Sequence, residues 1–137
     1  MEKKESDYLE LIKNLKIKNL RITSLNAWIA EDFSPPAEIR TKDKAELITG
    51  EGNGFKVLHL YQIRGKKEGE KEVKFKIDVT FEITYESNLQ ITPEEFEIFR
   101  KANLYLHTWP YLRELVQEVT LKMGLPPLIL SPYLIKP

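Results

Sequence analysis

The sequence predicts an α+β fold: a four-stranded antiparallel sheet with a short N-terminal helix, and with C-terminal helices packed on one face. Apolar and polar residues alternate without a break over 72–86, the pattern of a strand with one dry and one wet face. After Asn88 the apolar period changes from two to about 3.6 residues, which indicates helices. An order of strands first and helices last is typical of an antiparallel sheet covered on one side.

The chain of 137 residues is expected to form one domain over 1–137. Its 21 basic and 21 acidic residues cancel, and the lysines are interleaved with glutamates, so we expect no nucleic-acid partner. The absence of cysteine excludes a disulfide framework and a thiolate nucleophile. The sequence has neither an apolar signal core at its start nor a run of about 20 apolar residues, so we expect a cytoplasmic protein without membrane insertion.

The first two predicted elements are a short helix and a long, irregular strand. Asp7 and Glu10 have capping-box spacing, and apolar residues at helical spacing predict a helix over about 8–14. From Lys16 the pattern is that of a strand whose phase slips between Ile17 and Leu20, which predicts a bulge or a strong twist. Pro35 and Pro36 end this strand.

Three further strands complete the predicted sheet. The range 38–49 is the weakest, because it is polar until Leu47 and Ile48. The glycine-rich turn over 50–54 leads into a strand over 55–64 with one apolar face. A charged hairpin loop follows over 64–71, and in the last strand Val73 to Tyr85 are expected to alternate toward the core.

Two helices are predicted after the sheet. Thr92, Pro93 and Glu95 read as N-cap, N1 and N3 of a short helix that carries Phe96 and Phe99 inward. A second helix is expected to follow Pro110, and its apolar stripe consists of Leu112, Leu115, Val116, Val119 and Met123. Gly124 and the prolines after it end this helix, and 128–137 is expected to be extended.

The residues offer few parts for catalysis. His59 lies on the apolar phase of its strand, so we interpret it as a hydrogen-bonded core histidine, and His107 as a loop or cap residue. The two histidines lack metal-ligand spacing, and glutamates at 94, 95 and 97 are explained by the helix N-terminus. We therefore expect no enzyme, no metal and no cofactor.

Large apolar side chains exceed what one sheet face and one helix stripe can bury. Each is by default a core residue, yet their number near the loops and the tail indicates a groove or a subunit interface. They are Trp28, Phe33, Tyr105, Trp109, Tyr111, Leu128, Ile129, Leu130 and Tyr133.

The last quarter of the chain resembles the SecB family of bacterial export chaperones. The family's long helix opens with an aromatic-Pro-Tyr-x-Arg-Glu signature, and this chain has Trp109, Pro110, Tyr111, Leu112, Arg113 and Glu114 in that order. A Pro-x-Leu-x-Leu-x-Pro run follows at the family's spacing, over 126–132. The first hundred residues resemble the family in layout only. The signature residues could also be purely structural, with proline starting the helix and Arg113 pairing with a carboxylate.

The resemblance implies an ATP-independent holdase, linked to protein export, that binds apolar stretches of unfolded or partly folded polypeptide. It implies a peptide-binding groove near Ile29, Phe33, Tyr105, Trp109, Leu112 and Val116, and a homo-oligomer, either dimer or tetramer. The family's translocation ATPase meets a final helix and acidic tail that this sequence does not match. The longer N-terminal helix and the proline break suit the SecB-like chaperones that accompany toxin–antitoxin pairs. The alternatives are a dedicated module for one partner such as an antitoxin, and a small-molecule carrier.

Overall fold

The computed structural model describes residues 2–35, 37–49 and 53–132, so Pro36, part of the 50–54 turn and Tyr133 lie outside the described residues. Its elements in chain order are α1 (Glu2–Lys13), β1 (Lys16–Ile29), β2 (Ala37–Thr49), β3 (Gly54–Lys67), β4 (Val73–Glu86), α2 (Pro93–Phe99), η1 (Arg100–Leu104) and α3 (Tyr105–Lys122). The four strands form one antiparallel sheet in the order β1-β4-β3-β2. The predicted fold class is therefore confirmed.

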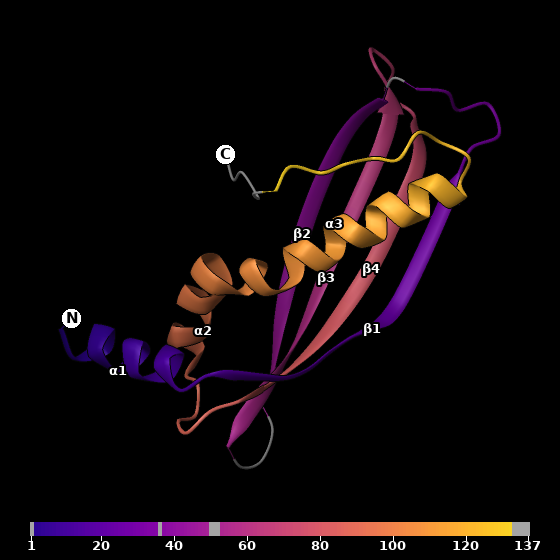
Figure 1. The fold of residues 1–137 in the computed structure, drawn as a ribbon. Coiled ribbons are helices and arrows are strands. Elements are labelled where there is room, and N and C mark those ends of the chain that lie inside the picture. Colours follow the sequence, from indigo (N-terminus) through magenta and orange to yellow (C-terminus); the bar gives the residue numbers. More distant parts are fainter. Residues whose placement is uncertain (1, 36, 50–52, 133–137) are drawn as a thin grey trace.

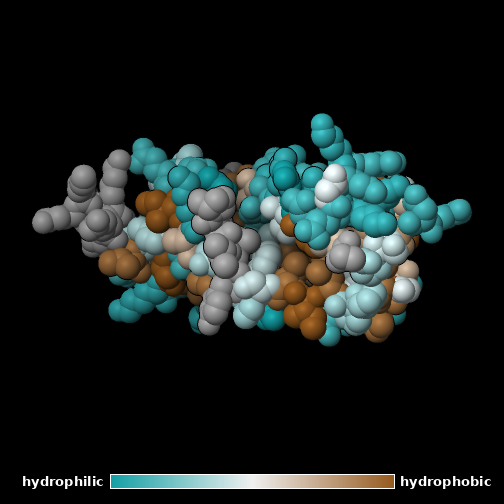
Figure 2. All heavy atoms as spheres, turned by 90° about the horizontal axis from the view of Figure 1, so that it is seen from above, coloured by the Kyte–Doolittle hydropathy of each residue, from teal (hydrophilic) through white to brown (hydrophobic). Residues whose placement is uncertain are grey.

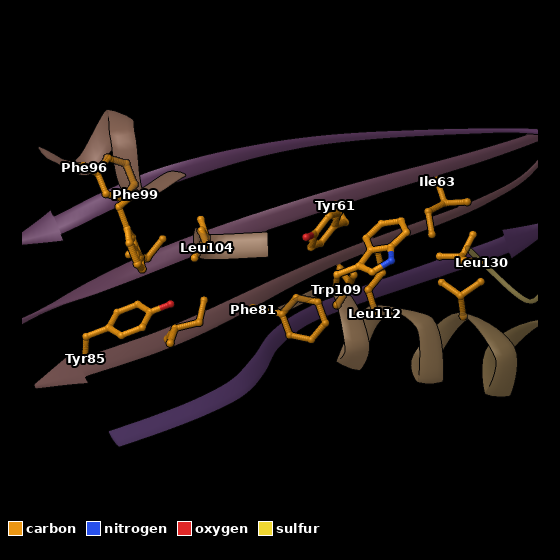
Figure 3. Close-up of a cluster of buried hydrophobic side chains, with 14 of the residues drawn as sticks. Tyr61, Ile63, Phe81, Tyr85, Phe96, Phe99, Leu104, Trp109, Leu112 and Leu130 are labelled. Atoms are coloured by element: carbon orange, nitrogen blue, oxygen red, sulfur yellow. The ribbon is translucent and has the colours of Figure 1, made fainter. Parts of the chain in front are cut away.

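The helices and the C-terminal segment cover one side of the sheet, which we call the inner face (Figure 1). Alternate residues of β3 and β4 are buried on this face, as the alternation predicted. They meet the buried residues of α2, η1 and α3 in one apolar cluster, whose members from Phe99 to Leu112 point toward the sheet in Figure 3. The opposite, outer face carries the polar residues of the alternation.

Two irregularities of β1 keep its apolar residues on the inner face. The register shifts between Ile17 and Asn19, as the phase slip predicted, and again between Ile22 and Ser24, which the sequence did not reveal. As a result Ile17, Ile22 and Leu25 lie opposite the inward residues Tyr85, Phe81 and Val79 of β4. At each shift β1 has one extra residue. In a regular strand without it, the apolar side chains that follow would point to the outer face.

A third irregularity corrects the prediction for Val73. Gly65 pairs with Phe75, but the next residue, Lys66, pairs with Val73, so Lys74 is the extra residue of a bulge. Val73 therefore does not point into the core with Phe75; it lines a concavity on the outer face together with Arg64. The alternating pattern alone could not show where the pairing skips a residue.

The helical region begins as predicted and continues further than predicted. Thr92 and Glu95 form both hydrogen bonds of the capping box, 3.1 and 3.0 Å long. The π-helical turn η1 then joins α2 directly to α3, so Pro110 lies inside α3 rather than at its start. A proline inside a helix costs about 3 kcal/mol. The burial of Trp109 and Leu112 on either side of it offsets that cost.

The described part of the C-terminal segment turns back along α3. The Leu128 amide donates to Thr120 Oγ1 at 2.8 Å, Arg113 Nε donates to the Leu130 carbonyl at 3.1 Å, and Trp109 Nε1 donates to the Ser131 carbonyl at 2.8 Å. Leu130 is buried near Trp109 and Ile63 (Figure 3). These contacts explain the spacing between the two sequence signatures. Trp109 and Arg113 of the signature in α3 bind backbone carbonyls in and next to the Pro-x-Leu-x-Leu-x-Pro run, and so hold that run against the helix.

The N-terminal helix α1 begins earlier than the predicted residue 8 and lies beside α2 (Figure 1). Leu11 is fully buried, and the Tyr8 hydroxyl donates to Asn103 Oδ1 of η1. No helix among residues 2–35, 37–49 and 53–132 is both long and apolar enough to cross a bilayer.

Candidate functional site

The inner face of β1 carries apolar side chains that the helices leave open. Ile17, Ile22 and Leu25 are 46%, 44% and 46% exposed, although their partners in β4 are fully buried. We call these three residues the β1 apolar strip. Their exposure is high for aliphatic side chains that sit next to a core, and exposed apolar residues gathered on one face often mark interaction sites.

The strip lies on an edge of the sheet. The backbone of β1 pairs with β4 on one side, and in the described part of the chain no strand pairs with the other side. At 14 residues β1 is a long edge, with its polar backbone groups available for another strand. Figure 2, which views the molecule from above, shows brown apolar side chains in separate patches between hydrophilic regions.

One end of the strip opens into a pocket of about 300 Å³ between α1, β1 and the helical region. Ile12, Leu15, Ile17, Asn103 and His107 line it, so Ile17 belongs to both features. An apolar wall with a few polar groups is the usual composition of a pocket that holds an apolar side chain.

His107 is not the loop residue that we expected, because α3 begins two residues before it. It is half-buried, and its Nδ1 is hydrogen-bonded to the Tyr85 hydroxyl at 2.8 Å. Burial lowers the pKa of His107 and raises the pKa of Tyr85. Both groups are therefore neutral near pH 7, which suits the rim of an apolar surface.

The six residues predicted to bind peptide divide into two groups. Ile29, Phe33 and Tyr105 are half-buried, and the Phe33 ring meets the Phe75 ring edge-on with centroids 5.4 Å apart. Trp109, Leu112 and Val116 are 5%, 0% and 0% exposed and belong to the core (Figure 3). A role in peptide binding stays a prediction for all six, and in the isolated chain only the first three offer surface to a ligand. The sequence prediction did not include Ile17, Ile22 and Leu25, because nothing in the strand pattern showed which of its apolar residues the helices leave uncovered.

Trp28 lies on the other side of β1. It pairs with Lys76 of β4, whose Nζ lies 5.7 Å from the centre of its ring, and it is 45% exposed. It therefore belongs to the outer face and not to the β1 apolar strip.

A chain of four polar groups, of which Asp43 reaches the surface and the other three are buried, runs from the sheet to α3. His59 Nε2 is hydrogen-bonded to Asp43 Oδ2 at 2.8 Å, His59 Nδ1 to the Thr108 hydroxyl at 2.9 Å, and the Thr108 hydroxyl to the Tyr61 hydroxyl at 2.8 Å. The order carboxylate, imidazole, hydroxyl is that of hydrolytic triads. Thr108 is, however, fully buried, so a substrate could not reach its hydroxyl. We assign the chain a structural role, and the interpretation of His59 as a hydrogen-bonded core residue is confirmed.

The described residues contain no group of three or more His, Cys, Asp or Glu side chains that could hold a metal ion. Burial raises the pKa of Tyr61, so this phenol also stays neutral. These polar side chains of the core are therefore hydrogen-bonded to one another, and the surface of the inner face that is open to a ligand along β1 is apolar.

The fold is that of the SecB-like chaperones. The structure is similar to the SecB-like chaperone Rv1957 of Mycobacterium tuberculosis, solved in complex with a ChAD peptide from the antitoxin HigA1, with a TM-score of 0.76 and 20% sequence identity over 94% of this chain and 96% of that one. It is also similar to a protein of unknown function from Streptococcus agalactiae, with a TM-score of 0.52 and 13% identity over 85% of this chain and 96% of that one. No protein-family profile and no curated protein sequence matches the chain. At these identities the likeness establishes the fold, and it confirms the resemblance inferred from the signatures at that level.

Proposed function

We propose that the protein is an ATP-independent holdase, which binds apolar stretches of unfolded or partly folded polypeptide on the β1 apolar strip and the pocket at its end. The observation that carries the proposal is the exposure of Ile17, Ile22 and Leu25 beside a fully buried core. An extended polypeptide could add to the free edge of β1 by backbone hydrogen bonds, which are independent of sequence. Its apolar side chains would then cover the strip.

The fold supports this proposal, because the similar SecB-like chaperone from Mycobacterium tuberculosis was solved with a peptide bound. The half-buried Ile29, the last residue of β1, and Phe33 after it extend the proposed surface. No nucleotide is needed in this mechanism, since affinity comes from burying apolar area and from pairing backbone groups.

Suppression of aggregation tests the holdase function. We expect the purified protein to prevent light scattering by a chemically denatured client at stoichiometric amounts, without ATP, and to do so for several unrelated clients. A protein of equal size without an open apolar strip serves as the control. Failure with every client, together with no binding of apolar peptides, would remove the proposal.

The second candidate is a dedicated module that recognises one partner, such as an antitoxin. The antitoxin peptide in the similar structure favours it. A binding survey separates the two candidates: comparable affinity for many unrelated unfolded chains supports the holdase, and one tight partner with no others supports the module. A link to export through the translocation ATPase stays a prediction, tested by co-purification with that ATPase.

We also propose that the protein assembles as a homo-oligomer, a dimer or a tetramer. The support is the long edge of β1, with which no other strand than β4 pairs among the described residues, because edges of this kind are usually covered in native proteins. A second copy that pairs with the backbone of β1 would leave the apolar side chains of the strip and the pocket to the client. Size-exclusion chromatography with light scattering measures the mass directly. A mass of one chain at micromolar concentration would contradict the assembly and leave the whole edge free for a client.

A further inference from the structure

The outer face of the sheet contains a second concavity, whose lining residues are mostly charged and not apolar. It has a volume of about 290 Å³ and lies over β2, β3 and the start of β4. Its lining consists of Glu38, Arg40, Lys42, Gln62, Arg64, Gly65, Lys66, Lys71 and Val73. The bulge at Lys74 creates part of this surface, because it turns Val73 outward beside the cationic side chains. Bulges commonly reorient side chains next to binding sites.

The lining is strongly cationic. Five of its nine residues are Lys or Arg and one is an acid, in a chain whose net charge is zero. The positive charge is therefore concentrated here and compensated elsewhere. A concave surface lined by one sign of charge focuses its electrostatic potential, which raises the local concentration of ligands of opposite charge.

The internal ion pairs neutralise only part of this charge. Glu38 is shared by Arg40 and Lys66, each at 3.5 Å, and Arg64 binds Asp78 at 2.6 Å. Lys42 and Lys71 are exposed, and within the described part of the chain neither has an acidic group within 4 Å. Two cations, together with the partly paired Arg40, are thus available to an external anion.

The size and surroundings of the concavity favour a short anion over a nucleic acid. A nucleic-acid backbone presents many phosphates in a row and is bound by an extended basic stripe. Here Glu38 and Asp78 lie among the cations, and Glu72 follows Lys71 directly. A short flexible chain with several adjacent carboxylates can place them beside the separate cations of this small concavity. Val73 can contact the methylene groups of such Asp or Glu side chains.

We propose that this concavity binds an acidic segment of a polypeptide, in which neighbouring Asp or Glu carboxylates pair with Lys42, Lys71 and Arg40. The site lies on the face opposite the helices, so it is separate from the β1 apolar strip. An acidic partner and an apolar client can therefore occupy one chain at the same time.

The test measures the binding of a fluorescent peptide that carries a run of glutamates, with a matched peptide that carries glutamines in their place. We expect the glutamate peptide to bind, with affinity that falls as salt rises, and the glutamine peptide not to bind. The double variant Lys42→Glu, Lys71→Glu is expected to weaken binding by at least about tenfold. The variant Lys18→Glu, Lys101→Glu makes the same change in net charge at exposed sites outside the concavity and is expected to bind as the unchanged protein does.

Equal weakening by the two double variants would overturn the proposal, because binding would then follow net charge alone. Equal binding of the glutamine peptide, absence of glutamate-peptide binding at low salt, or tighter binding of single-stranded RNA would also overturn it. Circular dichroism verifies the fold, and the milder variant Lys42→Gln, Lys71→Gln gives the same comparison if the charge reversal unfolds the sheet. Binding of an apolar peptide to the variants of Lys42 and Lys71 should be unchanged, which separates this proposal from the holdase.

Discussion

At the scale of single residues, Trp109 shows how a signature residue can be structural. Its indole is 5% exposed, lies 6.0 Å from the ring of Tyr61 between centroids, and donates to the Ser131 carbonyl. The residue thus joins three parts of the molecule: the sheet, α3 and the C-terminal segment. Sequence reasoning could identify Trp109 as important, but it could not decide between groove and core, because both require a large apolar side chain.

We predict that Trp109→Ala lowers the free energy of unfolding by about 3–5 kcal/mol, as expected for truncating a buried tryptophan. Trp109→Phe keeps most of the volume and loses the hydrogen bond to Ser131, so its cost should be about 1–2 kcal/mol. Urea denaturation followed by circular dichroism measures both values. A Trp109→Ala variant of unchanged stability that no longer binds clients would place the side chain in the groove instead.

For the hydrogen-bond chain of His59, the sequence predicted the buried position of the histidine but not its partners. The phase of the strand placed His59 in the core, but its partners come from β2 and α3. Asp43 stands on a polar strand that gave a weak prediction, and Thr108 stands in a stretch predicted to precede the helix. A single sequence does not reveal which polar residues meet across layers, because that depends on register and helix position.

His107 gives a prediction for pH dependence. Burial lowers its pKa in the folded state below the ordinary 6.5, so below that pH the unfolded chain binds a proton that the folded chain does not. The contribution of His107 to stability is therefore complete above pH 6.5 and is lost as the pH falls from there toward the lowered pKa. Unfolding measured at pH 5 and pH 7.5 should show a smaller loss for His107→Gln than for the unchanged protein. Equal losses would mean that His107 titrates normally.

At the scale of elements, the regular strands and the capped helix were predictable and the irregular joints were not. The range 72–86 and the Thr92 cap follow local rules of alternation and capping, and the structure confirms both. The start of α3 was missed because Pro110 looked like a first-turn residue, whereas the π-helical turn before it carries the helix through. The bulge at Lys74 depends on pairing with β3, which lies outside the local sequence.

The contact between β3 and β4 at Gly65 provides an element-scale prediction. A Cβ atom at Gly65 would lie 1.9 Å from Cε1 of the Phe75 ring, which no packing tolerates, so Gly65→Ala must displace that ring from the core. We expect a loss of about 1–3 kcal/mol in the free energy of unfolding. The double variant Gly65→Ala, Phe75→Leu should lose less than the sum of its single variants, since the smaller side chain leaves room. Additive losses would show that the ring does not oppose the new methyl group.

At the scale of the whole molecule, the sheet has two faces with different chemistry. The inner face is mostly apolar, and α3 and the C-terminal segment bury it over β3 and β4 but leave β1 open, while the outer face carries charge that gathers in one concavity. The sequence predicted this division from one alternating strand. It did not predict where the cover ends, because the path of α3 across the sheet is set by packing and not by local pattern.

The central claim is that the β1 apolar strip binds unfolded polypeptide, and the affinity for a labelled apolar peptide tests it most directly. The variant Ile22→Ser, Leu25→Ser removes two of the three residues of the strip, and Leu89→Ser, Leu121→Ser removes two aliphatic side chains elsewhere that are 41% and 60% exposed. Because each half-exposed aliphatic side chain contributes about 1 kcal/mol when a ligand covers it, we predict binding at least about tenfold weaker for the strip variant and unchanged for the control. Equal affinity of the two variants, with both folds intact, would contradict the account.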